Sequence, residues 1–179
     1  MIPETSSSTS STYGLISRIN HWVVAAAFLV ALGIGLVIDY GNLPEERVFT
    51  LYDWHMFFGM IVLVYGAWRV GWRMVHGFSD NLAPMPRWQN VLSKAVHIGL
   101  LAAIVLLPLS GVLMMISDGL AVAIWNVTLI PSIGEISWLN RGAGAVHGLS
   151  PYALVPLLVL HIGAALRHHF VKKNATLTA

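Results

Sequence analysis

Long apolar stretches without charged side chains dominate the pattern of this 179-residue chain. No Asp, Glu, Lys or Arg occurs in residues 19–38, 95–117 or 142–166, and a helix needs about 20 apolar residues to cross a bilayer. A fourth run, residues 54–68, is shorter and predicts a span whose helix continues past Arg69, a side chain long enough to reach the headgroups. The pattern predicts an all-α, integral membrane four-helix bundle. We place the spans at residues 20–38, 52–75, 91–117 and 144–168.

Basic residues are unevenly shared between the two sides of the predicted membrane. Four spans put both termini on one side, and that side holds eight of the ten Lys and Arg residues: Arg18, Arg69, Arg73, Arg87, Lys94, Arg167, Lys172 and Lys173. The positive-inside rule therefore predicts that both termini are cytoplasmic. The outer loops contain Arg47 and Arg141 with six acidic residues, which gives them a formal charge of −4.

Composition excludes several classes of protein. The chain is 56% hydrophobic and 10% charged, whereas soluble domains have about 45–50% and about 25%. A net charge of +2, scattered along the chain, is too small for a nucleic-acid-binding face. The absence of cysteine excludes disulfides, thiolate zinc sites, cysteine-ligated iron–sulfur clusters and haem attached through a C-x-x-C-H motif.

Two segments outside the spans have distinct compositions. Residues 1–13 are serine-rich and too weakly basic for a signal-peptide n-region, so we predict a disordered cytoplasmic tail before an uncleaved domain at residues 14–177. Residues 118–140 form the one long connection, and their apolar side chains predict a segment that lies on the membrane surface or folds over the bundle.

Histidines carry the candidate chemistry, because an ionisable residue inside a membrane is costly and usually functional. His21, His97 and His161 fall in the cytoplasmic half of the predicted spans, and His55 and His147 fall near the outer ends. The remaining three, His76, His168 and His169, lie at or beyond the cytoplasmic boundary.

The spacing of the deeper histidines predicts two binding sites. His147 and His161 are fourteen residues apart, which separates them by about 21 Å along one helix and leaves them on nearly the same face. His55 is at the depth of His147, and His21 is at the depth of His161. Facing pairs at two depths match two haems, each with one axial nitrogen on either side of the iron.

Small and basic residues accompany these histidines. Three small residues one helical turn away would leave room for a macrocycle: Ala25, Gly59 and Ala165. Arginine binds carboxylates well, so haem propionates could pair with Arg18, Arg69 and Arg73, although these residues equally serve the positive-inside rule.

Alternatives stay open at this level. His97 competes for a place at the inner haem, and a single membrane histidine is often a hydrogen-bonded core residue. A metal transporter also places histidines in its spans, but it would gather its ligands at one depth, preferably with carboxylates. Apart from Asp53 at the outer end of the second span, no Asp or Glu lies within the expected spans, which disfavours both metal transport and a carboxylate proton relay.

These residues give the sequence a resemblance to the bacterial cytochrome b561 family, dihaem four-helix membrane cytochromes related to the cytochrome b subunit of nickel hydrogenases. The resemblance runs from about residue 13 to residue 177 and includes His21-Trp22, Trp54-His55 and the stretch 108–111, Pro-Leu-Ser-Gly. Its most specific part is residues 160–170, which contain His161 and the His168-His169 pair.

The resemblance implies a ligand set and a function. His21 and His161 would bind the iron of the inner haem b, and His55 and His147 that of the outer one, while His97 would lie beside the inner haem or near a quinone. The implied activity is single-electron transfer across the bacterial inner membrane, with exchange of electrons with ubiquinone or another quinone.

Two forms of this function remain open. The chain could be a quinone-linked oxidoreductase, in one version a superoxide:ubiquinone oxidoreductase, or it could be a haem b anchor subunit that relays electrons from a dehydrogenase or a periplasmic partner. Some members of the family oxidise superoxide, but Val146 stands where a superoxide-oxidising relative has tryptophan. An outer charge of −4 would also repel an anion over long range, unless Arg47 or Arg141 attracts it locally.

Overall fold

The computed structural model describes residues 15–76 and 86–171, and the predicted tail at residues 1–13 lies outside this part. Its long helices are α1 (Leu15–Tyr40), α2 (Glu45–His76), α3 (Arg87–Ser117) and α4 (Ser137–Leu166). All four are long and apolar enough to span a membrane, which confirms the predicted four-helix membrane bundle. The helices extend beyond the charge-free runs because polar residues continue them past the apolar layer.

The C-terminal boundary of the fourth span differs from the prediction. We expected one helix over residues 144–168, whereas α4 begins at Ser137 and ends at Leu166. A π-helical turn, η1 (Arg167–Val171), continues from it and contains both His168 and His169. A change of helical geometry of this kind rotates the side chains that follow, so the two histidines do not continue the register of α4.

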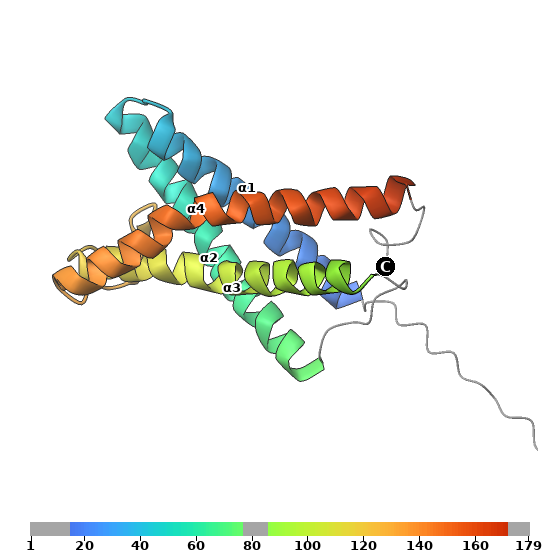
Figure 1. Ribbon diagram of the computed structural model, residues 1–179. Coiled ribbons are helices and arrows are strands. Elements are labelled where there is room, and N and C mark those ends of the chain that lie inside the picture. The colour runs from blue at the N-terminus through green and yellow to red at the C-terminus, as the bar shows by residue number, and fades with distance from the viewer. Residues whose placement is uncertain (1–14, 77–85, 172–179) are drawn as a thin grey trace, which may run out of the picture.

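The bundle consists of two antiparallel hairpins. Helix α1 packs along α2, α3 packs along α4, and the two hairpins cross obliquely, with α2 against α3 (Figure 1). We call the end that holds the α1–α2 turn and the α3–α4 connection the outer end. The opposite, inner end holds the start of α1 and the end of α4.

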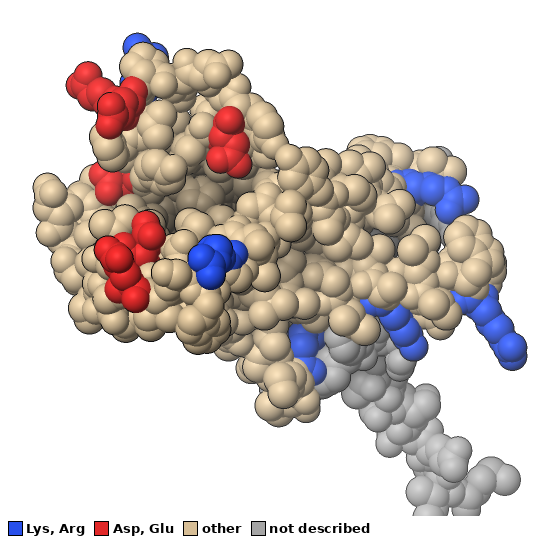
Figure 2. All heavy atoms as spheres, turned by 60° about the vertical axis from the view of Figure 1, so that its left-hand side comes forward, with Lys and Arg blue, Asp and Glu red and all other residues tan. Residues whose placement is uncertain are grey.

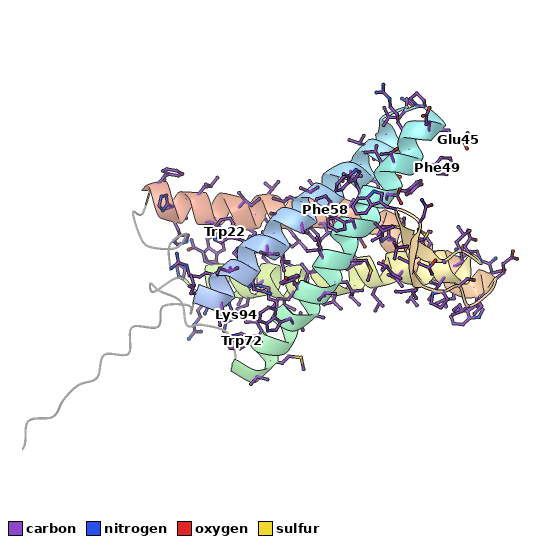
Figure 3. The ribbon with its side chains drawn as sticks, turned by 180° about the vertical axis from the view of Figure 1, so that it is seen from behind. Trp22, Glu45, Phe49, Phe58, Trp72 and Lys94 are labelled. Carbon is purple, nitrogen blue, oxygen red and sulfur yellow. The ribbon has the colours of Figure 1, made fainter. Side chains whose placement is uncertain are left out.

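A layer of apolar side chains at mid-depth holds the hairpins together. The buried members of this layer are Val24, Ala27, Phe28, Val62, Ile104 and Leu154. Most other large apolar side chains point outward and are exposed, as expected for helices surrounded by lipid. Figure 3 shows Trp22, Trp72 and Lys94 toward the inner end, Glu45 and Phe49 toward the outer end, and Phe58 between them.

Helices α2 and α3 approach closely at a glycine. A Cβ atom on Gly66 would lie 2.9 Å from the carbonyl oxygen of Ile104, so only glycine fits there. Pro108, four residues after Ile104, has no N–H to donate to that carbonyl, which leaves it facing α2. The glycine and the proline together therefore set the contact between the two hairpins.

The α3–α4 connection contains a small β-hairpin. Strands β1 (Val122–Ile124) and β2 (Val127–Ile130) are antiparallel, and Trp125 and Asn126 between them have φ angles of 47° and 68°. Two positive φ angles are typical of a type I′ turn. The turn packs against the outer end of α2, which corresponds to the second of the two predicted placements, folding over the bundle.

Aromatic side chains fix the hairpin on α2. The ring of Trp125 lies 4.9 Å from that of Trp54 and 5.3 Å from that of Phe57. The backbone N–H of Trp125 also donates a hydrogen bond of 3.4 Å to Asp53 Oδ1. The hairpin is therefore attached to the residues that flank His55.

Charge is divided between the two ends. Figure 2 shows acidic side chains gathered at one end of the molecule and most of the basic ones at the other. Within the described residues, the acidic side chains at the outer end are Asp39, Glu45, Glu46, Asp53, Asp118 and Glu135. The predicted orientation, with both termini cytoplasmic, depends on this division of charge and stays a prediction.

Candidate functional site

Two histidines from different hairpins face each other in the outer half of the bundle. The ring centres of His55 on α2 and His147 on α4 lie 5.9 Å apart, with the ring planes at 85°. Nδ1 of His55 lies 3.0 Å from the carbonyl oxygen of Ala31, and Nδ1 of His147 lies 3.0 Å from that of Leu107. A carbonyl only accepts, so each Nδ1 carries the proton and each Nε2 keeps a free lone pair.

Glycines make room for both outer rings. A Cβ atom on Gly35 of α1 would lie 3.1 Å from Cε1 of His55, and one on Gly111 of α3 would lie 3.0 Å from Cε1 of His147. Each ring thus packs against the bare backbone of a neighbouring helix. By contrast, a Cβ on Gly59 would meet nothing within 4 Å, so the space beside this residue is open, as we expected for the histidine face.

Three histidines gather in the inner half. His161 on α4 lies between the other two, with its ring centre 6.3 Å from that of His21 on α1 and 5.2 Å from that of His97 on α3. His97 is exposed, and its Nδ1 lies 2.7 Å from the carbonyl oxygen of Ser93 on its own helix. The inner half therefore contains the predicted pair together with its competitor.

A seven-residue spacing connects the two histidine levels through the apolar layer. On α4 this interval separates His147, Leu154 and His161. Each of the other three helices has a set with the same interval: His21, Phe28 and Gly35 on α1; His55, Val62 and Arg69 on α2; and His97, Ile104 and Gly111 on α3. Residues seven apart share a helix face. Each helix thus directs one residue to the outer level, one to the apolar layer and one to the inner level.

Basic side chains lie beside the inner histidines. Nη1 of Arg69 donates hydrogen bonds of 3.3 Å to the carbonyl oxygen of Ser17 and to Oδ1 of Asn20. Asn20 is buried and donates in turn to the Tyr65 carbonyl. Arg69 and Arg73 line a hollow between α1 and α2 and lie within electrostatic reach of His21. Arg18, the third predicted arginine, is exposed near the start of α1.

The geometry of both pairs fits an iron held between two imidazoles. Two rings that bind one metal from opposite sides, with metal–nitrogen bonds of about 2 Å, have centres roughly 6 Å apart. The His55–His147 and His21–His161 separations both match this value. In the described residues, no three His, Asp or Glu side chains converge on a point where a lone metal ion would sit.

Sequence reasoning missed the backbone partners of the outer histidines. The accepting carbonyls belong to Ala31 and Leu107, whose side chains give no indication of this role. The glycines that contact the rings were detectable, because Gly35 and Gly111 lie fourteen residues after His21 and His97 on the same helix faces. The small residues that contact these rings lie across a helix interface, not one turn away on the helix of the histidine.

Comparisons with known proteins give the same family from nearly the whole chain. A sequence model described as prokaryotic cytochrome b561 matches residues 12–179. Cytochrome b561 homolog 2 of Escherichia coli (strain K12) is 26% identical over 173 residues, which cover 94% of this chain and 90% of that protein. Cytochrome b561 homolog 1 of the same organism is 29% identical over 104 residues, 57% of this chain and 59% of that protein.

The extent of the family match agrees with the fold, because it includes all four spanning helices and both histidine levels. We conclude that the chain belongs to the prokaryotic cytochrome b561 family and is a multi-pass membrane cytochrome that binds haem b and transfers electrons.

Proposed function

We propose that the chain holds two haems b, one between His55 and His147 and one between His21 and His161. The observation that carries this proposal is the pair of ring separations, 5.9 Å and 6.3 Å, at two levels of α4. When bound, each haem supplies a centre that accepts or releases one electron. An iron held by two histidines in this way would have no position left to bind oxygen or substrate.

The protein orients the outer ligands through its backbone. The Ala31 and Leu107 carbonyls hold the His55 and His147 rings in the tautomer that presents Nε2. Gly35 and Gly111 restrict where those rings can sit. Because the ligands come from different hairpins, the outer site requires the two hairpins to be correctly crossed.

The inner site has a basic border. Arg69 and Arg73 are suited to the two propionate carboxylates of an inner haem, because guanidinium groups bind carboxylates in a planar fork. The Asn20 and Ser17 oxygens hold Arg69 toward α1, beside His21. Arg18 would serve mainly to fix the topology. His97 is then a neighbour of the inner haem that does not bind the iron.

We further propose that both termini are cytoplasmic, that the membrane is the bacterial inner membrane and that the cytochrome exchanges electrons with ubiquinone or another quinone. The support for the orientation is the basic inner end and the acidic outer end (Figure 2). Quinone is the natural partner of a membrane cytochrome with no open coordination position, because it accepts or gives electrons within the bilayer.

Haem content tests the ligand assignment. Purified protein should contain two haems b per chain, measured as pyridine haemochrome. His55→Ala and His147→Ala should each leave one haem, and His21→Ala and His161→Ala should each leave the other, with a different reduced-minus-oxidised spectrum. One haem or none in the unmodified protein would overturn the two-haem proposal.

His97 provides the internal control for the inner site. His97→Ala should keep two haems per chain, because His21 and His161 already have the separation that a bis-imidazole iron needs. If His97→Ala loses the inner haem and His21→Ala retains it, the ligand is His97.

Reduced quinone tests the proposed electron partner. Mixing the protein with a reduced quinone should reduce its haems, and a protein that stays oxidised would contradict exchange with quinone.

The acidic outer end bears on the electron donor. It favours a positively charged protein donor over superoxide, an anion that the six carboxylates repel. We therefore place the haem b anchor, which receives electrons from a dehydrogenase or a periplasmic protein, ahead of a superoxide:ubiquinone oxidoreductase. Quinone-dependent loss of superoxide by the isolated protein would reverse this order, whereas co-purification with a redox partner and no turnover alone would support it.

A further inference from the structure

The two histidine pairs have different surroundings, and each difference would shift the reduction potential of a bound haem in the same sense. We propose that the residues around His55 and His147 favour ferric iron and that those around His21 and His161 favour ferrous iron. The outer haem is then the low-potential centre and the inner haem the high-potential one. This inference rests on the proposed binding of two haems.

Backbone carbonyls make the outer ligands more electron-rich. Both Nδ1–H groups of the outer pair donate to carbonyl oxygens at 3.0 Å, those of Ala31 and Leu107. Such bonds increase the basicity of a metal-bound imidazole. A more basic imidazole stabilises the more highly charged ferric state and lowers the reduction potential.

Within the described part of the chain, the inner histidines His21 and His161 have no such hydrogen bonds to backbone carbonyls. Neither ring nitrogen of His21 or of His161 has a hydrogen-bond partner there, and their ring contacts are with Trp22, with His97 and with each other. Of the three inner histidines, His97 has such a bond within the described residues, from its Nδ1 to the Ser93 carbonyl oxygen. The inner imidazoles are therefore the less basic pair.

Fixed charges act in the same direction. The carboxylate of Asp39, at the outer end of α1, lies within electrostatic reach of His55, while the guanidinium of Arg69 lies within reach of both His21 and His161. A bis-imidazole haem is one charge more positive when ferric than when ferrous. A nearby carboxylate thus lowers its potential and a nearby guanidinium raises it.

The two propionates that each haem brings are common to both sites, so the difference between the sites comes from the protein. The residues around His21 and His161 would therefore favour placing the first added electron on the inner haem, while those around His55 and His147 would keep the outer haem oxidised. An electron delivered to the outer haem would consequently pass inward across the apolar layer to the centre of higher potential.

Potentiometry followed by optical spectroscopy tests the assignment. The detergent-purified protein should show two one-electron steps, and the step that is missing in His147→Ala should be the lower one. The step that is missing in His161→Ala should be the higher one. The reverse order, or two equal potentials, would overturn the inference while leaving two haems per chain intact. Fewer than two haems would instead overturn the proposed function.

Charge variants test the cause at low ionic strength, where screening is weak. Asp39→Asn should raise only the lower potential, shifting the ratio of reduced to oxidised outer haem about two- to fivefold at a fixed ambient potential. Glu46→Gln removes the same charge from the outer end, but Asp39 and not Glu46 acts electrostatically on His55, so this variant should change neither step. Equal effects of the two variants would contradict a local role for Asp39.

The inner counterpart is Arg69→Gln, which should lower only the higher potential. If that variant loses the inner haem, Arg73→Gln provides the same test, because Arg73 also lies within reach of His21 but has a weaker influence than Arg69. An unchanged higher potential in an arginine variant that retains two haems would show that these charges do not set the difference.

Discussion

The hydroxyl of Ser110 lies 3.3 Å from Nδ1 of His147. The same hydroxyl donates a hydrogen bond of 2.7 Å to the Leu107 carbonyl, which is also the acceptor for His147. Ser110 is buried on α3 and therefore shares its acceptor with a proposed iron ligand. A carbonyl that already accepts a short bond is a weaker acceptor for a second donor, so Ser110 moderates the basicity of His147.

Replacing Ser110 with alanine should therefore strengthen the bond from His147 to the Leu107 carbonyl. We expect Ser110→Ala to lower the potential of the outer haem, shifting its ratio of oxidised to reduced forms about three- to tenfold, with the inner haem unchanged. Ser117→Ala is the matched control, because Ser117 is equally buried on α3 and its hydroxyl donates to the Leu113 carbonyl, away from any histidine. An effect of both variants on the outer haem would indicate a general change in α3.

Gly35 offers a steric test of the outer site. A Cβ atom there would press on Cε1 of His55 at 3.1 Å, so Gly35→Ala should displace the ring and lower the occupancy of the outer haem about tenfold at limiting haem. Gly33→Ala, two residues away, adds a Cβ that meets nothing within 4 Å, and it should retain full haem content. Alanine favours the helix by about 1 kcal/mol over glycine at either position, so helix propensity alone predicts no loss.

The sequence was sufficient for the helices and for the histidine pairs, since both depend on side chains whose cost inside a membrane is high. Charge-free runs locate a span, and a fourteen-residue interval places His147 and His161 on one face of α4. The helix ends were less predictable, because an interfacial residue such as Glu45 continues a helix as readily as it ends one. The choice between His21 and His97 depends on how the hairpins cross, which no local pattern specifies.

The β-hairpin shows a different limit of sequence reasoning. Its turn consists of Trp125 and Asn126, not the Asn-Gly or Asp-Gly pair that indicates a type I′ turn from sequence. The strained backbone at Trp125 is stabilised by its aromatic contacts with Trp54 and Phe57, which are distant in sequence. Tertiary contacts of Trp125 therefore stabilise this turn, and the residues of the turn alone do not predict it.

Trp125→Ala should release this hairpin from α2. Aromatic pairs of this kind contribute about 0.5–1.5 kcal/mol beyond the area they bury, and Trp125 makes two of them. We expect limited proteolysis within residues 118–136 to become about tenfold faster, with both haems retained. Trp138→Ala removes a tryptophan that is 72% exposed near the start of α4 and should leave the cleavage rate unchanged. Equal cleavage of the two variants would mean that the ring contacts do not hold the hairpin.

Haem removal should weaken the contact between the two helical hairpins. Helices α1 and α4 pack much less closely than α1 with α2 or α3 with α4, and both histidine pairs use α4. Bound haem would therefore connect α4 to α1 and α2 through iron. Ligand binding at a concentration 1,000 times its Kd adds about 4 kcal/mol of stability, so protein produced under haem limitation should unfold at a lower temperature in detergent.

One hydrogen bond joins α1 and α4 directly, so it should matter most when haem is absent. The hydroxyls of Tyr40 on α1 and Tyr152 on α4 are 2.7 Å apart, and such an exposed bond contributes about 1 kcal/mol. Tyr40→Phe should cost little in the haem-loaded protein, because the proposed inner haem would already join α1 to α4. In haem-depleted protein the same variant should lower the unfolding temperature more, because this hydrogen bond then contributes a larger fraction of the interactions between α1 and α4. Unfolding can be followed by tryptophan fluorescence. If Tyr40→Phe shifts the unfolding temperature equally in the haem-loaded and haem-depleted protein, haem does not connect the two helical hairpins.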